Sequence, residues 1–226
     1  APLDHTNYGY LAEVLWQLGE REKAIEKIRH AVTIEPGYDW GWRALRDWAQ
    51  QIGKPELALE YARALTAKRP KQARSWLILA QTEAQEVEER LQAVERAIEL
   101  NPYLVDAHGL KSRLLTQLRR YDQARLACHP AVYGGTLPPE LRCAEAIIEA
   151  DRGDLQEAVK QLRMFVEEEP NYYPAWNLLA DWYRATDAKQ QYLDAAGEMV
   201  RLAPHRPVPL GYLAEAQLFN DDRARA

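Results

Sequence analysis

The sequence predicts an all-α solenoid, a stack of antiparallel helix hairpins, and three regularities of spacing support this prediction. Three of its prolines are each preceded by a glycine at −17 and an alanine at −12, and each is followed by a tryptophan at +6. Prolines themselves recur along the chain 34, 32, 68 and 34 residues apart, at Pro36, Pro70, Pro102, Pro170 and Pro204. A period of this length across 226 residues indicates stacked copies of one small unit rather than a single closed globule.

Six complete units follow from this period, and a seventh begins after them. They span residues 5–38, 39–72, 73–104, 105–138, 139–172 and 173–206, and residues 207–226 form either a capping helix or the start of a further unit. Each unit contains two apolar-periodic segments of about a dozen residues, the length of an ordinary helix. We therefore expect thirteen helices, two per unit and one after Pro207.

The pattern inside a unit explains why its two helices pair. In the first segment a bulky residue at unit position 4, leucine at 7 and a small residue at 8 share one helical stripe. In the second segment small residues at positions 20 and 27 let the two backbones approach closely, and the proline at 32 ends the helix. A hairpin of this kind must stack on its neighbours to bury its apolar face. We expect Trp42, Trp76 and Trp176, all at position 4, to be buried between adjacent hairpins.

Two units depart from the pattern. Pro130 falls inside the second segment of unit four, so that helix should kink or end early. Unit five has Glu145 at position 7, where leucine is expected. A register shift of one residue fits unit five equally well, because it places three apolar residues on the stripe, namely Leu141, Ala144 and Ile148.

These residues carry a resemblance to a known family. Unit one, HTNYGYLAEVLWQLGEREKAIEKIRHAVTIEPGY, and the segment LRRYDQARLACHPAV of unit four resemble tetratricopeptide repeats, and the resemblance extends over about 200 residues. It implies a right-handed superhelix and a scaffold that binds a protein or peptide partner in a concave groove lined by the first helices.

A second resemblance leaves an alternative function open. The segments EPGYDWGWRAL and EPNYYPAWNLL are similar to the repeats of protein prenyltransferase α-subunits. That family expects Trp-x-x-Arg, whereas this chain has Leu45 and Leu179 at the arginine position. The alternative is therefore an accessory or substrate-recruiting arm of an enzyme, either α-subunit-like or fused to a catalytic domain outside this segment.

Composition argues against several other classes of protein. The net charge is −5 with both signs interspersed, which argues against nucleic acid as a partner. No apolar run approaches the roughly 20 residues of a membrane-spanning helix, and no signal-like segment is present, so we expect no membrane insertion and a cytoplasmic protein. Serines, histidines and the cysteines Cys128 and Cys143 form no catalytic or metal-binding pattern. We expect no enzymatic activity, no cofactor and no metal.

The resemblance also implies which residues face the groove, namely unit positions 2, 5, 9 and 12. Among them are three arginines in successive units, with two tryptophans nearby, and guanidinium groups bind carboxylates in a bidentate manner. We hypothesise that they hold an acidic partner, although Asp47, Asp106 and Glu140 are equally able to neutralise them. The candidate partner-binding residues are Trp16, Trp40, Arg43, Asp47, Arg74, Gln81, Arg113 and Asn177.

The C-terminal segment LGYLAEAQLFNDDRARA begins like another first helix. Its adjacent apolar residues, Leu218 and Phe219, are compatible with a cap only if one of them turns inward. We expect the native protein to continue past residue 226 and this end to self-associate weakly through Leu218 and Phe219.

Overall fold

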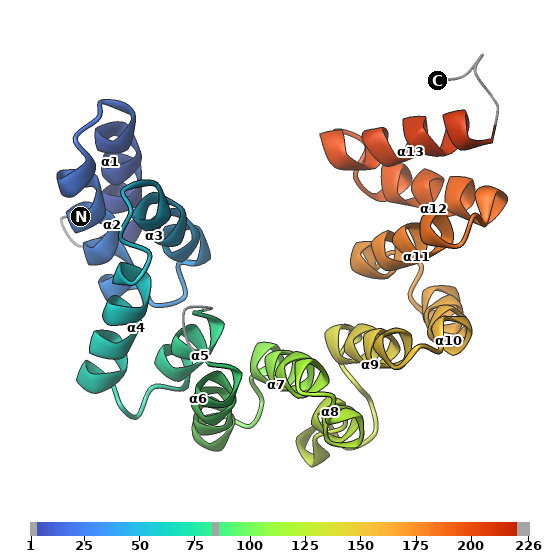
Figure 1. Cartoon of the computed structure of the whole chain (residues 1–226), viewed down its shortest axis with the longest axis horizontal. Coiled ribbons are helices and arrows are strands. Elements are labelled where there is room, and N and C mark those ends of the chain that lie inside the picture. Colours follow the sequence, from blue (N-terminus) through green and yellow to red (C-terminus); the bar gives the residue numbers. More distant parts are fainter. Residues whose placement is uncertain (1–3, 83–85, 221–226) are drawn as a thin grey trace. The chain divides into compact units, whose positions relative to one another are not determined.

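The chain folds entirely into helices in the part that the structure describes. The computed structural model describes residues 4–82 and 86–220, which form thirteen α-helices, one short 3-10 helix and no strand (Figure 1). This number confirms the expected two helices per repeat and one more. The helices are α1 (His5–Gln17), α2 (Arg21–Ile34), α3 (Asp39–Gln51), α4 (Leu57–Lys68), α5 (Ala73–Gln81), α6 (Val87–Leu100), α7 (Val105–Gln117), α8 (Tyr121–Cys128), η1 (Ala131–Tyr133), α9 (Pro139–Arg152), α10 (Leu155–Glu168), α11 (Tyr173–Ala185), α12 (Lys189–Leu202) and α13 (Pro207–Phe219).

These helices divide into two compact units. The first unit ends at Leu118 and contains α1 to α7, and the second begins at Arg119 and contains α8 to α13. The boundary lies in the turn between α7 and α8, inside the fourth predicted repeat. In the first unit α1 packs on α2, α3 on α4 and α5 on α6, and in the second α9 packs on α10 and α11 on α12. A single array through all 226 residues stays a prediction.

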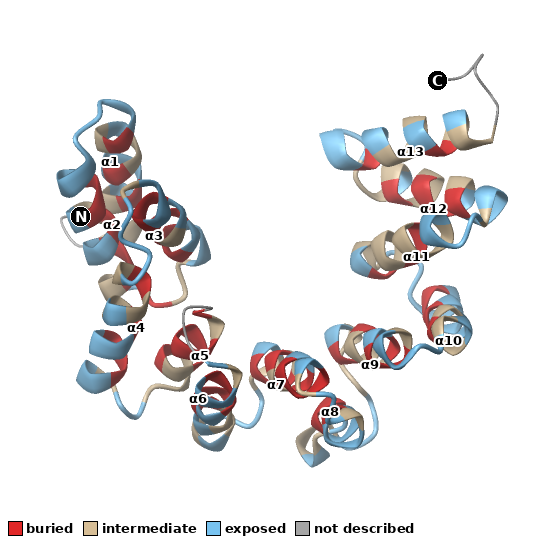
Figure 2. Cartoon of the chain, in the orientation of Figure 1, coloured by how far each residue is buried: buried red, intermediate tan, exposed pale blue. Residues whose placement is uncertain are grey.

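Small residues lie buried where the helices of a pair meet. The residues at position 8 of five repeats have at most 1% of their surface exposed; they are Ala12, Ala80, Ser112, Ala146 and Ala180. In the second helix of the first repeat, Ala24 and Ala31 are fully buried. Figure 2 shows the buried residues concentrated on helix faces that are turned toward a neighbouring helix. Close backbone approach, predicted from these positions, is therefore what pairs the helices.

A recurrent hydrogen bond explains the six-residue spacing between proline and tryptophan. The indole Nε1 of Trp42 donates to the carbonyl of Pro36 at 3.2 Å, and Trp76 and Trp176 donate to the prolines six residues before them at 2.9 Å. In the fourth repeat the Nε2 of His108 lies 2.8 Å from the carbonyl of Pro102. A carbonyl oxygen only accepts, so this histidine has its proton on Nε2. In these four repeats the aromatic ring thus ties the first helix to the turn that precedes it.

The expected burial of all three tryptophans is correct for Trp42 alone. Trp42 is 5% exposed, whereas Trp76 and Trp176 are only partly buried. The bond to the prolyl carbonyl does not account for this difference, because Trp42 forms it as well. At Trp176 a pocket of about 340 Å³ between α10, α11 and α12 exposes the ring further.

The two irregular repeats behave as the sequence indicates. Helix α8 ends at Cys128, two residues before Pro130, so that it has 8 residues. In α9 Leu141 and Ile148 are buried and Ala144 is half-buried, as the shifted register predicts, but Ala146, at position 8 of the unshifted register, is also fully buried, so both registers keep support. Glu145 lies off that apolar stripe, with its carboxylate 2.9 Å from the Nε2 of His129 and 3.7 Å from the Nη2 of Arg125.

At the other end of the second unit, Phe219 of α13 is turned inward. The ring of Phe219 lies 6.2 Å from that of Tyr192, which is fully buried, in an edge-to-face arrangement. The Tyr192 hydroxyl donates to Glu215 at 2.9 Å. Leu218 is 56% exposed and points away from this contact. The inward turn of Phe219 meets the condition for a capping helix.

Candidate functional site

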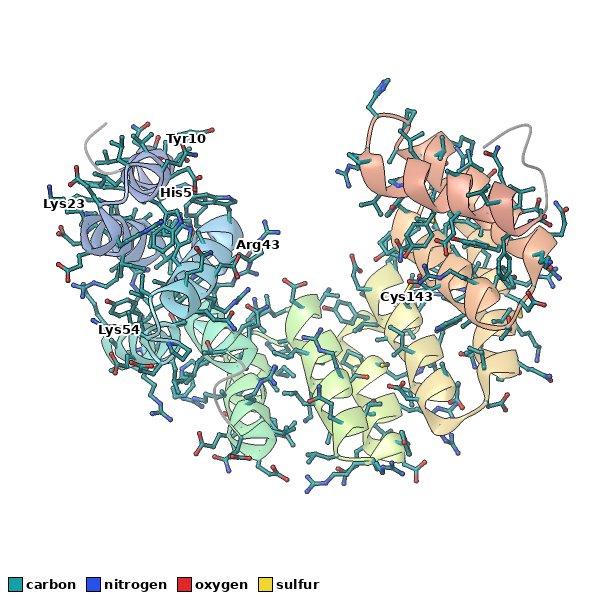
Figure 3. All side chains as sticks on the ribbon, turned by 45° about the horizontal axis from the view of Figure 1, so that its top comes forward. His5, Tyr10, Lys23, Arg43, Lys54 and Cys143 are labelled. Atoms are coloured by element: carbon teal, nitrogen blue, oxygen red, sulfur yellow. The ribbon has the colours of Figure 1, made fainter. Side chains whose placement is uncertain are left out.

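The first helices of three successive repeats in the first unit line a pocket that is rich in arginine. It has a volume of about 520 Å³ and receives residues from α3, α5 and α7. Figure 3 marks Arg43 on α3. The lining consists of Asp39, Trp42, Arg43, Arg46, Arg74, Gln81, Asp106 and Arg113.

Arg74 is the central cation of this pocket and is already neutralised. Its Nη2 lies 3.2 Å from Asp39 of α3, and its Nη1 lies 3.3 Å from Asp106 of α7. Both aspartates are largely exposed, so each ion pair contributes only about 0–1 kcal/mol to stability. Arg74 therefore joins three first helices, and both carboxylates of the pocket are used on it.

The other three arginines of the pocket form no ion pair with any described residue. Arg43 and Arg113 are exposed, and Arg46 is half-buried. With four guanidinium groups against two carboxylates, the pocket is positive although the chain as a whole has a net charge of −5. Such a cluster attracts anions, and its planar guanidinium groups suit carboxylates.

The two predicted tryptophans belong to an aromatic cluster in the first unit and do not line the pocket. Trp16 stacks on Trp48 with ring centroids 4.7 Å apart, and Trp40 meets Trp48 edge to face at 6.2 Å. Trp16 is only 9% exposed, and the Arg21 guanidinium lies 4.0 Å above its ring. The structure thus makes Trp16 a packing residue. Trp40, at 36% exposure, is accessible to a partner, one helical turn before Arg43.

The remaining predicted residues lie partly outside this pocket. Gln81 lines it, whereas Asp47 is exposed and does not. Asn177 lies in the second unit, where its Nδ2 donates to Asp181 at 3.2 Å. Glu140 also lies in the second unit. Of the proposed neutralising residues, only Asp106 pairs with a pocket arginine.

Sequence reasoning missed Arg46, although a signal for it exists. Position 8 is alanine or serine in five repeats, and in the second repeat it is Arg46. A long charged residue at a position that normally packs marks a place where the helix faces solvent. Asp39, at position 1, was missed because the resemblance gives that position no role in the groove.

No catalytic or metal-binding constellation occurs among residues 4–82 and 86–220. No group of three or more histidine, cysteine, aspartate or glutamate side chains there is arranged to hold a metal ion. Cys128 and Cys143 are both buried and are not joined in a disulfide. Burial, with Glu140 beside it, raises the pKa of the Cys143 thiol to about 12. In the same residues no helix is long and apolar enough to span a bilayer.

The fold and sequence match those of known repeat proteins. A family model described as tetratricopeptide repeat matches residues 49–103. The chain is similar to a tetratricopeptide repeat protein from Parabacteroides merdae ATCC 43184, with a TM-score of 0.56, 17% identity, and 94% of this chain and 98% of that chain covered. Residues 49–103 thus match the tetratricopeptide repeat family, and the chain shares the fold of tetratricopeptide repeat structures over most of its length.

Other solved structures extend this similarity. One is TTC0263, a thermophilic tetratricopeptide repeat protein of Thermus thermophilus (TM-score 0.51, 19% identity, 95% of this chain and 99% of that chain). Another belongs to the APC/C hetero-tetramer Cut9–Hcn1 (TM-score 0.52, 11% identity, 95% of this chain and 43% of that chain). No curated protein sequence matches the chain. Tetratricopeptide repeats generally mediate protein–protein interactions and are themselves non-catalytic.

Proposed function

We propose that this helical repeat protein is an interaction scaffold that binds an acidic segment of a partner protein at the arginine pocket of α3, α5 and α7. The observation that carries the proposal is a set of three arginines around one pocket, Arg43, Arg46 and Arg113, that form no ion pair with a carboxylate of residues 4–82 or 86–220. Exposed Trp40, one turn before Arg43, offers the partner an apolar anchor.

The chemistry of the pocket limits what the partner presents. Arg74 is held by Asp39 and Asp106, so its charge is not available to a ligand without breaking two ion pairs. The three other arginines provide charge for two or more carboxylates in an extended or helical segment. Rim charges of this kind act mainly on association rate and on salt dependence.

Charge reversal at Arg43 and at Arg113 tests the proposal. The probe is a fluorescein-labelled peptide of glutamate and aspartate residues, and binding is measured by fluorescence anisotropy. We expect Arg43→Glu and Arg113→Glu each to weaken binding by about tenfold, or about 1.4 kcal/mol, and to flatten its salt dependence. Arg206→Glu, the same charge change at an exposed residue of the second unit, is the matched control.

Arg74→Glu, which the sequence suggests as a test, does not test binding cleanly. It would place a third carboxylate between Asp39 and Asp106 and perturb the fold. Equal binding by wild type, Arg43→Glu and Arg113→Glu, at low and at high salt, would refute the arginine pocket as the binding site.

We also propose weak self-association through the outer face of α13. Leu210 and Leu218 are 47% and 56% exposed on this helix, whereas Phe219 is turned onto Tyr192 and is not available. Two exposed leucines on one face form a modest apolar patch. Sedimentation at rising concentration should show a dimer that Leu218→Glu abolishes, and a strict monomer at every concentration would refute this contact.

A further inference from the structure

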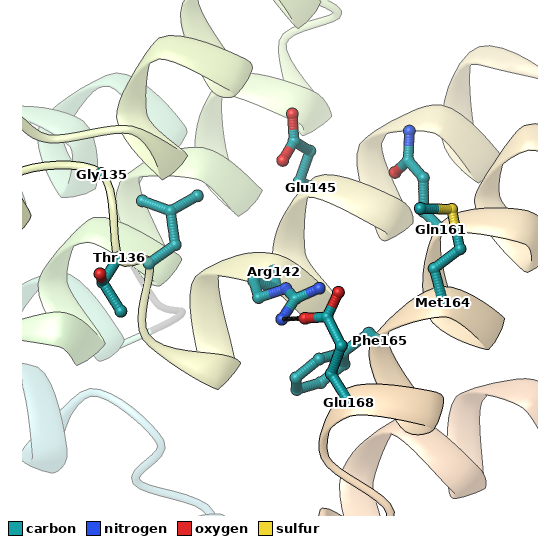
Figure 4. A pocket seen from close by; sticks show the side chains of 9 residues that line it. Gly135, Thr136, Arg142, Glu145, Gln161, Met164, Phe165 and Glu168 are labelled. Carbon is teal, nitrogen blue, oxygen red and sulfur yellow. Dashed lines mark hydrogen bonds and ion pairs between the residues drawn. The ribbon is translucent and has the colours of Figure 1, made fainter.

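The pockets of the two units differ in the charge that they leave unpaired. A pocket of about 470 Å³ in the second unit is lined by the loop before α9, by α9 and by α10 (Figure 4). Its Arg142 pairs with Glu168 at 2.6 Å, and its Glu145 lies 2.9 Å from the Nε2 of His129. The charged side chains that line this pocket within residues 86–220 are therefore all paired.

The arginine pocket of α3, α5 and α7 has an excess of positive charge. Its described lining contains four guanidinium groups and two carboxylates, so two positive charges are not balanced. Both carboxylates are held by one arginine, because Asp39 and Asp106 lie 3.2 Å and 3.3 Å from Arg74. The unbalanced charge therefore lies on the other three arginines, which form no ion pair with a carboxylate of the described residues.

These three arginines reach the pocket from two helices. Arg43 and Arg46 are three residues apart on α3 and share one helix face, whereas Arg113 belongs to α7. Like charges at this spacing repel one another, and an anion bound between them removes the repulsion. A group that pairs with all three must therefore accept hydrogen bonds from α3 and from α7 at once.

A phosphoryl group meets these requirements better than a single carboxylate. On a side chain it carries a charge of about −1.5 to −2 at pH ~7 and presents three acceptor oxygens that point in different directions. This charge matches the excess of the pocket, whereas a carboxylate supplies one negative charge and accepts through two oxygens in one plane. All four cations of the described lining are arginines, whose forked donors bind phosphate in a bidentate manner.

We propose that the arginine pocket binds a phosphorylated side chain of the partner's acidic segment, between Arg43 and Arg46 on α3 and Arg113 on α7. This inference rests on the proposed function and specifies which anion the pocket recognises. Arg74 acts as a positioning residue, because its ion pairs with Asp39 and Asp106 join the three helices that line the pocket. Binding of the partner then depends on its phosphorylation.

Peptides of matched charge test whether the pocket recognises a phosphoryl group or negative charge alone. Two fluorescein-labelled peptides share their flanking glutamates and differ at the centre, where one has phosphoserine followed by alanine and the other has a pair of glutamates. Fluorescence anisotropy with the whole chain at pH ~7.5 should give a Kd about tenfold lower for the phosphoserine peptide. Inorganic phosphate should displace this peptide only at a concentration about a hundredfold above the peptide's Kd, because it makes no contact outside the pocket.

Neutral substitutions show whether the arginines produce this preference. Arg46→Gln and Arg113→Gln should each reduce it from about tenfold to about twofold, whereas Arg206→Gln, at an exposed residue of the second unit, should leave it unchanged.

The possible outcomes separate this inference from the proposed function. Equal affinity for the two peptides, or a preference that persists in Arg46→Gln and Arg113→Gln, would overturn recognition of a phosphoryl group. Displacement by inorganic phosphate near the peptide's own Kd would overturn it too, because the pocket would then bind the free anion. In each of these cases weaker binding of both peptides by Arg43→Glu would still support the proposed function. Indifference of both peptides to Arg43→Glu and Arg113→Glu would refute the two proposals together.

Discussion

Replacing Gly41 with alanine tests how closely the first two repeats approach one another. A Cβ at Gly41, in the first turn of α3, would lie 2.5 Å from Cδ1 of Tyr38 and 2.7 Å from Cγ1 of Val32. The Tyr38 ring cannot withdraw freely, because its hydroxyl already lies against Gly9 of α1. Val32 is 1% exposed and equally confined. The added methyl group must therefore displace packed side chains.

Two opposing contributions set the change in stability that Gly41→Ala causes. Alanine is better than glycine in a helix by at most about 1 kcal/mol, whereas overpacking of a close contact costs about 1–3 kcal/mol. Since both neighbours of Gly41 are confined, we expect the upper part of this range and a net loss of about 2 kcal/mol. The control is Gly197 of α12, where an added Cβ meets no atom within 4 Å. There the helix-propensity gain of about 1 kcal/mol is unopposed, so Gly197→Ala should stabilise the protein.

Thermal unfolding followed by circular dichroism distinguishes the predicted destabilisation by Gly41→Ala from the predicted stabilisation by Gly197→Ala. For a chain of this size 1 kcal/mol corresponds to about 2–4 °C in Tm, so Gly41→Ala should lower Tm by about 4–8 °C and Gly197→Ala should raise it by about 2–4 °C. Tryptophan fluorescence assigns the change to the first unit, because five of the seven tryptophans lie before Leu118. A gain in Tm for Gly41→Ala equal to that of Gly197→Ala would refute the close packing of Tyr38 between α1 and α3.

The other predictions concern burial and ionisation. Trp42→Ala should lower the free energy of unfolding, measured in urea, by about 3–5 kcal/mol. Trp76→Ala and Trp176→Ala should lower it clearly less, because these two rings are only partly buried. Equal losses in all three variants would contradict this prediction. Burial raises the pKa of Tyr172 to about 12, so its neutral form contributes stability that is complete below pH ~10 and is lost as pH rises through about 12. The titration of Tyr172 is followed by phenolate absorbance, as the difference between the wild type and Tyr172→Phe. A pKa of Tyr172 near 10 would contradict the prediction. The raised pKa of Cys143 and its burial predict that thiol reagents fail to modify it at pH ~8 until the chain is unfolded.

The candidate site could be predicted only in part from the sequence. Arginines at groove-facing positions of three successive repeats predicted Arg43, Arg74 and Arg113, and the structure brings all three to one pocket. The sequence could not predict that Arg74 is paired with carboxylates while Arg43 and Arg113 are exposed. The ion pairs of Arg74 come from Asp39, 35 residues before it, and Asp106, 32 residues after it. The burial of Trp16 likewise depends on Trp48, which stacks on it from another repeat.

Sequence by itself determined the helical repeat of this protein, because its evidence is local. Proline ends a helix, small residues permit close approach, and a bulky residue at a fixed offset fills the seam, so the thirteen helices and the early end of α8 could be predicted. The tertiary structure alone decided which side chains remain available to a partner. It placed Arg74 between two carboxylates, turned Phe219 inward and left Met164 open beside the loop. Availability depends on neighbours contributed by other helices, and a one-dimensional pattern specifies the helix but not the partners that its surface meets.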